Sequence, residues 1–356
     1  MIGGDFVVTE PVLLYTHIMF SLVFLSFSCK NNVPTPSNWQ PCEDALVNWQ
    51  GPEGSDFGFR MYLHQDDVYI TAPNDCHTPL YQLEDNRLSP IDWNTDECLP
   101  RLGQDIVSDE QVWLYAPTKQ EWHTGYAPNV LTGRRLTFVE EQTVRLTTNT
   151  LYQNDQMVSF DHPSVDMARY ATDIAVLLRS SPASIWTKKG TYTLSEQGGL
   201  FNRIHPFINT PNGERQWLLG GGQELVIVNR TAQTNTTITL PTNSRIQIEA
   251  TRHPLSSIGY SSALGDIDRD GRLDWLVGAP TAGSGTSEDF PEQAGWVGWL
   301  EQHNGQWLLQ QEWVGAEPFA HLGMSLIIQT SDTRQRVLGG ASGTNSVSEL
   351  FCLENQ

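Results

Sequence analysis

A short recurring unit constrains the fold of this chain more than any other feature of its sequence. Each copy opens with an aromatic residue, Leu or Ile beside Gly, and runs through a strand and a turn. A second apolar strand follows and ends in small residues. Four copies are clear: Phe57-Gly58 leads to residues 68–73, Leu102-Gly103 to 112–117, Ile258-Gly259 to 275–280, and Leu322-Gly323 to 337–341. Weaker copies centre on residues 174–178 and 217–221.

The spacing of these copies identifies the architecture. The six copies lie roughly 40 to 60 residues apart, which is the length of a four-stranded propeller blade. The pattern therefore predicts an all-β propeller of six blades, with seven as the alternative. Pairing of the N-terminal strand with the last blade would close the ring and remove its exposed edges. A β-sandwich with turn-rich corners explains the repeated Ala-Pro corners less well.

The charge of the chain excludes one class of partner. Its 356 residues include 41 acidic and 21 basic side chains, which give a net charge of −20. Such a surface repels phosphate backbones, so we expect no nucleic-acid ligand. The same carboxylates favour solubility outside the cytoplasm and are available to divalent cations.

The N-terminal segment indicates export. An apolar run over residues 11–28 ends in small residues directly before Cys29, and a polar, Pro-bearing stretch follows. This order resembles a bacterial lipoprotein signal and implies a lipidated Cys29 and tethering at the cell envelope or surface. Residues 1–28 contain no Lys or Arg, so an uncleaved membrane anchor is the alternative. We divide the chain into a signal or anchor (1–29), a tether (30–41) and the repeat domain (42–356).

The cysteine count agrees with this division. There are five cysteines, and lipidation of Cys29 would leave four for disulfides: Cys42, Cys76, Cys98 and Cys352. Cys76 and Cys98 are close in sequence, and a closed ring would bring the ends that carry Cys42 and Cys352 together. Three connectivities remain open. None of the cysteines has the spacing of a zinc site.

One copy of the repeat carries metal chemistry. Four carboxylates occupy positions 1, 3, 5 and 9 of a loop: Asp266, Asp268, Asp270 and Asp274. Gly271 stands at position 6, and the carbonyl of Arg272 would add a main-chain ligand at position 7. Calcium takes six to eight oxygen ligands, and a tight loop directs alternate side chains toward one point. EF-hand and dockerin loops require an acid at position 12, where this chain has Val277 in an apolar run.

The loop together with its flanking Ile258-Gly259 and Gly278-Ala279-Pro280 resembles the FG-GAP repeat of integrin alpha-chain heads. Residues 51–59 look like the opening of such a head, and residues 45–49 lie where the N-terminal strand completes the last blade in that family. The resemblance spans about residues 42–356 and is weak between about 120 and 245. It implies a calcium-binding propeller for adhesion or protein interaction, although integrin heads have seven blades and usually three or four calcium loops. We therefore expect a stand-alone relative.

We find no combination of nucleophile, base and oxyanion site in the sequence, so we expect a binding protein and not an enzyme. His205 and His321 are expected to pack or to lie at the surface. Trp113, Trp217 and Trp275 are expected to pack between blades. Packing is also the favoured role for four further tryptophans, which could otherwise form an aromatic surface that binds sugar: Trp93, Trp122, Trp296 and Trp299.

The leading functional prediction is thus a calcium-binding, surface-tethered adhesion or protein-interaction module, with its ligand on one loop face of the ring. A carbohydrate-binding propeller is the alternative, and a polysaccharide-active enzyme is a more distant one.

Overall fold

The structure is a computed structural model of the chain. It describes residues 39–355 except 43–45, 65, 76, 85, 94–97, 100, 109–110, 125–129, 140–141, 155, 171, 195–200, 209–214, 223, 230–233, 239–256, 286–289 and 304–305. All of them lie in the unit Pro36–Gln356, separate from Met1–Thr35. The signal or anchor, most of the tether, Cys29 and Cys76 lie outside the described residues. In the described part of the chain, no helix has the length and apolar character needed to cross a membrane.

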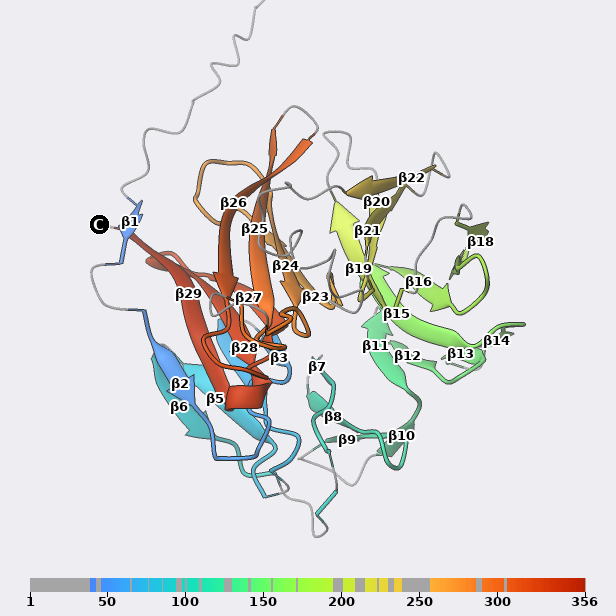
Figure 1. Cartoon of the computed structure of the whole chain (residues 1–356). Coiled ribbons are helices and arrows are strands. Elements are labelled where there is room, and N and C mark those ends of the chain that lie inside the picture. The colour runs from blue at the N-terminus through green and yellow to red at the C-terminus, as the bar shows by residue number, and fades with distance from the viewer. Residues whose placement is uncertain are drawn as a thin grey trace, which may run out of the picture. The chain divides into compact units, whose positions relative to one another are not determined.

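The described strands form seven antiparallel sheets, and each sheet is one blade (Figure 1). Six blades are made of four strands that follow one another in the chain. Blade 1 contains β3 (Met61–His64), β4 (Asp67–Thr71), β5 (Leu80–Glu84) and β6 (Arg87–Pro90). Blade 2 contains β7 (Ile106–Ser108), β8 (Val112–Ala116), β9 (Glu121–Thr124) and β10 (Val130–Thr132). Blade 3 contains β11 (Arg135–Val139), β12 (Gln142–Leu146), β13 (Thr150–Gln153) and β14 (Gln156–Ser159).

The remaining blades follow the same order. Blade 4 contains β15 (Ser164–Tyr170), β16 (Asp173–Leu178), β17 (Ser184–Thr187) and β18 (Gly190–Thr193). Blade 5 contains β19 (Arg203–Ile208), β20 (Arg215–Gly220), β21 (Leu225–Asn229) and β22 (Thr234–Ile238). Blade 6 contains β23 (Ser261–Gly265), β24 (Asp274–Ala279), β25 (Trp296–His303) and β26 (Gln306–Val314). Blade 7 contains β27 (Leu322–Thr330), β28 (Arg334–Ala341), the 3₁₀ turn η1 (Ser342–Thr344) and β29 (Ser346–Asn355), and is completed by β1 (Trp39–Pro41) and β2 (Asn48–Gln50).

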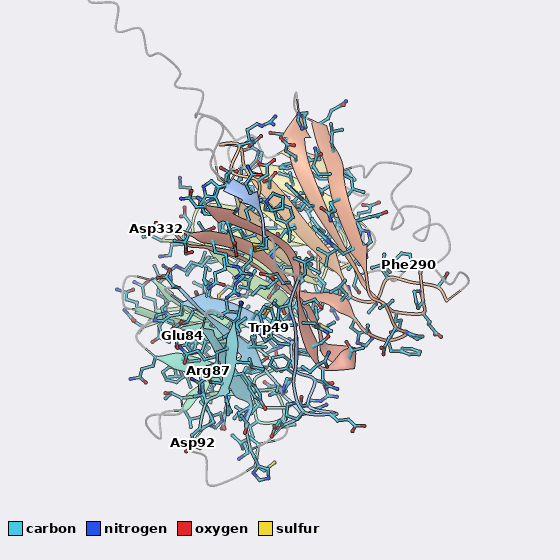
Figure 2. The ribbon with its side chains drawn as sticks, turned by 90° about the vertical axis from the view of Figure 1, so that its left-hand side faces the viewer. Trp49, Glu84, Arg87, Asp92, Phe290 and Asp332 are labelled. Carbon is cyan, nitrogen blue, oxygen red and sulfur yellow. A yellow bond between two sulfur atoms is a disulfide. The ribbon has the colours of Figure 1, made fainter. Side chains whose placement is uncertain are left out.

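The ring is closed from the N-terminal side, as the sequence predicts, but by two strands: β2, which overlaps the predicted residues 45–49, and β1, which lies in the predicted tether. Both β1 and β2 pair antiparallel with β29, the last strand among the described residues. Cys42 and Cys352 form a disulfide beside this pairing, with Cα atoms 5.5 Å apart. Trp49 of β2 also donates its indole N–H to the carbonyl of Asn86 in blade 1, at 3.1 Å (Figure 2). The closure therefore ties both ends of the propeller to each other and to the neighbouring blade.

The blade count is seven, so the preferred count of six is corrected in favour of its alternative. The blade without a copy in the sequence repeat is blade 3, residues 135–159. Its second strand, β12, is buried at alternate positions only, whereas the equivalent strand β24 is buried throughout. The chain after β12 continues as Thr147-Thr148-Asn149 and has no Ala-Pro corner. Blade 3 thus forms without the apolar strand and small-residue corner by which the other blades are recognised.

The core is divided among the junctions between blades. The buried apolar side chains described by the structure form seven clusters, one at each junction. Trp113, Trp217 and Trp275 each lie in such a cluster, which confirms their predicted packing between blades. The second set of tryptophans is buried too, with exposed fractions of 0–7%: Trp93, Trp122, Trp296 and Trp299. These four residues pack, as the sequence favours, and do not form an exposed aromatic surface for a sugar.

The glycines of the repeat are required by close backbone contacts. The lead Gly58 has φ +87° and donates its amide to the carbonyl of Thr71 in its own blade, at 3.1 Å. At the junction of blades 5 and 6, a Cβ added to Gly220 would lie 2.7 Å from the Cα of Gly259. The same contact recurs at the next two junctions, where Gly278 abuts Gly323 and Gly340 abuts Gly58. The Gly of one corner thus lies against the lead Gly of the next blade.

This packing predicts the cost of adding one methyl group. A Cβ at Gly278 would clash with the Ser261 hydroxyl and the Gly323 carbonyl. We expect Gly278→Ala to lower the free energy of unfolding by roughly 1–3 kcal/mol, as overpacking does elsewhere. Gly54→Asn is the control, because no atom lies within 4 Å of its Cβ position and Asn tolerates its φ of +71°. Urea denaturation measures the free energy of unfolding of both variants, and equal values would contradict the packing argument.

Candidate metal centre

The predicted calcium loop is the hairpin turn of blade 6, between β23 and β24. It starts at Asp266, directly after β23, and returns to the sheet at Asp274, the first residue of β24. Gly271 has φ +85° at the reversal, a conformation that favours glycine. β24 is buried throughout, including Asp274, whereas β23 is mostly half-buried, and the other three acids lie in the turn between the two strands.

The structure brings three of the four predicted carboxylates together. Oxygens of Asp266, Asp268 and Asp274 all lie within 4.8 Å of one another. Asp266 accepts a hydrogen bond from the Gly271 amide at 3.0 Å, and Asp274 accepts one from the Ile267 amide at 2.6 Å. The second oxygen of each of these two carboxylates is buried and has no hydrogen-bond partner in the described structure. Two buried, unpartnered carboxylate oxygens beside a third carboxylate suit a divalent cation.

The fourth carboxylate, that of Asp270, is paired with Arg272 and does not join the other three. Asp270 accepts a hydrogen bond from Nε of Arg272 at 2.6 Å and also forms an ion pair with the same guanidinium. Arg272 further pairs with Glu301 of β25, with Nη2 and Oε1 2.5 Å apart. Glu301 lies directly opposite Asp274 in the sheet. It adds a buried acid that the loop motif does not include, because it lies on the next strand.

Protonation equilibria reflect this crowding of acids. Burial raises the pKa of Asp274 to about 6, and burial with the neighbouring Asp270 raises the pKa of Asp268. Burial would also raise the pKa of Asp270, but the hydrogen bond from Arg272 holds it below the usual value. Asp268 and Asp274 are thus destabilised as anions, whereas Asp270 is stabilised by its contact with Arg272.

Blade 7 supports the loop from one side. The side chain of Gln335 on β28 donates to the carbonyl of Ile267 at 2.8 Å and also to that of Asp266. Arg269 donates to the carbonyl of Ser331 at 3.2 Å, and its guanidinium lies 4.3 Å from the ring centre of Trp39. The position of the loop is therefore set by two blades and by the N-terminal strand β1.

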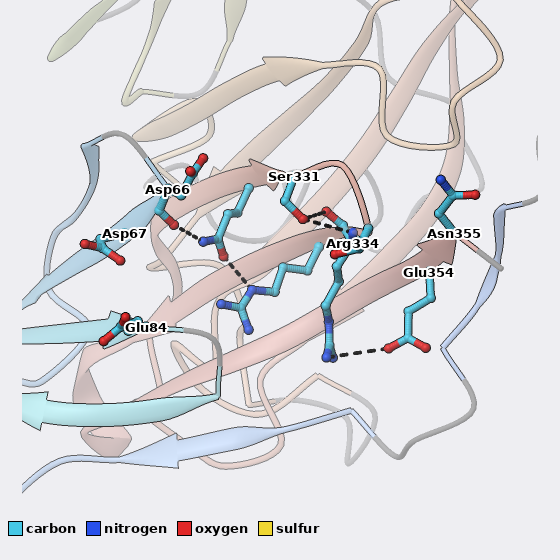
Figure 3. A pocket seen from close by; sticks show the side chains of 10 residues that line it. Asp66, Asp67, Glu84, Ser331, Arg334, Glu354 and Asn355 are labelled. Atoms are coloured by element: carbon cyan, nitrogen blue, oxygen red, sulfur yellow. Dashed lines mark hydrogen bonds and ion pairs between the residues drawn. The ribbon is translucent and has the colours of Figure 1, made fainter.

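A groove of about 710 Å³ lies between blades 7 and 1, next to the same Ser331 turn (Figure 3). Blade 1 contributes Asp66, Asp67 and Glu84, and blade 7 contributes two arginines. Both arginines have protein partners: Arg334 contacts Glu349 at 3.1 Å, and Arg336 contacts Asn86 at 3.0 Å. Asp66 and Glu84 are exposed, consistent with acids on solvated turns.

A second polar site lies where the first strands of the blades meet, and the sequence analysis missed it. It is a cavity of about 330 Å³ lined by residues from all seven blades. One charged side chain from the start of each of blades 1 to 5 forms an alternating circle around it, in the order Arg60, Asp105, Arg135, Asp166, Arg203. Arg169, farther along β15 of blade 4, also lines the cavity. Arg135 lies 3.0 Å from Asp105 and 2.6 Å from Asp166, whereas the other two arginine–aspartate separations are 3.7 and 3.9 Å.

Tyr260 of blade 6 completes this circle. Its hydroxyl accepts a hydrogen bond from Arg60 at 3.2 Å, and the guanidinium of Arg203 lies 4.2 Å from its ring centre. Nearby His205 contacts the Gly259 carbonyl at 3.0 Å, and burial lowers its pKa to about 4, so it packs as a neutral side chain. His321 is partly buried, and burial lowers its pKa as well. Both histidines agree with the prediction of packing or surface roles.

The sequence contains a pattern for this second site, but its residues are spread over several blades. Arg60, Arg135 and Arg203 each stand at or directly before the first strand of blades 1, 3 and 5. An alignment of the blades would have shown a basic residue at this position in alternate blades, but blade 3 was not recognised as a copy.

Comparisons with known proteins identify the fold. No model of a known protein family and no curated protein matches the sequence. Among solved structures, the WD40 β-propeller domain of Doa1 has 11% identity and a TM-score of 0.55, over 89% of this chain and 97% of that one. YCF48 bound to a D1 peptide has 11% identity and a TM-score of 0.49, over 87% of this chain and 98% of that one. The chain is thus a seven-bladed β-propeller, and the FG-GAP resemblance rests on its motifs.

The circle of charges predicts an unusual tyrosine. Burial would raise the pKa of Tyr260, but Arg60 and Arg203 lower it to about 8. One of the ten tyrosines should therefore ionise near pH 8, as an absorbance step at 295 nm that Tyr260→Phe removes. Because the folded-state pKa lies below the usual 10, ionisation adds stability as pH rises from 8 to 10. A wild-type curve without the early step would contradict the electrostatics described.

Proposed function

We propose that this chain is a calcium-binding propeller that acts as an exported protein-interaction module, of the kind that adhesion proteins carry. The observation that supports calcium best is the pair of buried, unpartnered oxygens on Asp266 and Asp274, beside Asp268. The cation would be held by these three carboxylates, with the carbonyl of Arg272 and the released Asp270 as further ligands. Bound calcium supplies positive charge that stabilises the clustered acids and stiffens the hairpin.

The propeller fold is consistent with a module that binds proteins. A closed ring presents its hairpin turns and inter-blade connections at two faces while the blades stay fixed. The candidate calcium loop, the Ser331 turn and the groove of Figure 3 are linked by direct contacts. Calcium would thus order a continuous stretch of one loop face, which supports a partner site there.

Thermal unfolding of the purified full chain, after chelation and then with millimolar calcium, tests the metal proposal. Calcium that binds only the folded state raises stability by about 2.7 kcal/mol at 100 times its Kd. We expect the wild-type melting temperature to rise and Asp266→Asn to lose the response. Arg272→Gln is the matched control, because it keeps the main-chain carbonyl and releases Asp270, so its response should persist. An unresponsive wild type, or an unchanged response in Asp266→Asn, would refute the calcium site.

Export with a lipid on Cys29 is the second part of the proposal, supported by the apolar run before that residue. We expect the wild-type chain to partition into the detergent phase of a cloud-point extraction and Cys29→Ala to enter the aqueous phase. Ser37→Ala, within the tether, should behave as wild type. Retention of Cys29→Ala in the detergent phase would instead favour an uncleaved anchor.

A further inference from the structure

The circle of charges in the central cavity is incomplete at one position. Around the ring the order is Arg60, Asp105, Arg135, Asp166, Arg203, and an acid would be next in the alternation. Blade 6 supplies Tyr260 there, which is neutral at neutral pH. Blade 7 contributes a main-chain carbonyl, that of Met324, which accepts from Arg60 at 2.9 Å. The three arginines of the circle therefore face two aspartates, and a fourth arginine that lines the cavity, Arg169, donates to the carbonyl of Phe138; the protein as a whole has a net charge of −20.

The excess positive charge lies at Arg60 and Arg203. Arg135 takes the close contact with both aspartates, at 2.6 and 3.0 Å, and leaves the outer arginines at 3.7 and 3.9 Å from the same acids. Nε of Arg203 is buried and has no hydrogen-bond partner in the described part of the chain. A buried donor without a partner costs free energy, and an anionic acceptor would remove that cost. Both arginines also contact Tyr260, so they flank a single point.

We propose that the central cavity binds a small free oxyanion, a sulfate, phosphate or carboxylate group, between Arg60 and Arg203 and beside Tyr260. The anion supplies the sixth charge of the alternation and accepts from the unpartnered Nε of Arg203. A cavity of about 330 Å³ suits a small ligand and is at the lower end of common ligand-site volumes. Planar guanidinium groups match the paired oxygens of such anions.

The proposal links anion binding to ionisation of Tyr260. Its phenolate would occupy the position of the missing acid, so anion and phenolate compete for the same two arginines. The other titratable and charged groups that face the cavity are Asp105, Arg135, Asp166, Arg169 and His205. Arg135 holds the pKa of Asp166 below its usual value, and burial lowers the pKa of His205 to about 4, so neither of these two groups titrates near pH 8. Anion binding should weaken above pH 8, and saturating anion should shift the 295 nm step of Tyr260 to higher pH.

Isothermal titration calorimetry on the purified full chain tests the proposal, with inorganic sulfate and then acetate as probes at constant ionic strength in chloride. We expect heat of binding for the wild type and roughly tenfold weaker binding for Arg203→Gln, because charge-assisted bonds are lost. Arg87→Gln is the matched control: Arg87 is exposed on the outermost strand β6 (Figure 2) and should leave binding unchanged. Binding of either probe with this variant pattern supports the site.

Tyr260→Glu gives an independent test that does not depend on losing an arginine. Its carboxylate would complete the alternation within the protein, so the variant should fold, melt above the wild type and bind neither probe. Absence of binding heat in the wild type, or equal binding by wild type and Arg203→Gln, would overturn the proposal. So would a Tyr260 step that saturating sulfate leaves in place.

Discussion

Every other feature of this structure depends on the pairing of β1 and β2 with β29. Without those two strands, blade 7 would expose the free edge of β29, and the junction of blades 7 and 1 would lose Trp49 from its core. The inner sides of these two blades also contact each other directly, where the Ser325 hydroxyl donates to the Gly58 carbonyl at 2.9 Å. Outer pairing and inner contact together close the circle that sets the geometry of the charged cavity. The disulfide between Cys42 and Cys352 adds a covalent bond to a closure that hydrogen bonds and apolar packing already define.

Closure also explains why the two candidate sites differ in kind. The loop of blade 6 is made of residues that are neighbours in the sequence, and blade 7 only supports it through Gln335 and Arg269. The central cavity takes one or a few residues from each blade, so its electrostatics exist only in the complete ring. The first site can be regarded as local chemistry, and the second as a property of the whole propeller.

The sequence predicts those features that depend on residues close to one another in the chain. The recurring Gly corners predicted the all-β propeller and its closing strand, since those corners are contacts between second strands and lead glycines. The motif at residues 266–274 located the acidic hairpin. The seventh blade was missed because β12 is buried only at alternate positions and no small-residue corner follows it. The sequence also does not predict that Asp270 pairs with Arg272, because Arg272 is placed by its contact with Glu301 on the next strand. Nor does it predict the circle of charges, because that circle depends on contacts between blades.

The order of the strands along the chain has a consequence for biosynthesis. During translation, β1 and β2 emerge before the strands of blades 1 to 6, yet their partner β29 emerges after all of those strands. Blades 1 to 6 each consist of consecutive strands and can pair as they emerge, but the ring stays open until β29 has been made. Cys42 must therefore wait, through 310 residues of separation, for Cys352. A chain that carries this bond has been synthesised at least through Cys352 in β29, so the disulfide marks molecules in which the strands of all seven blades have been made.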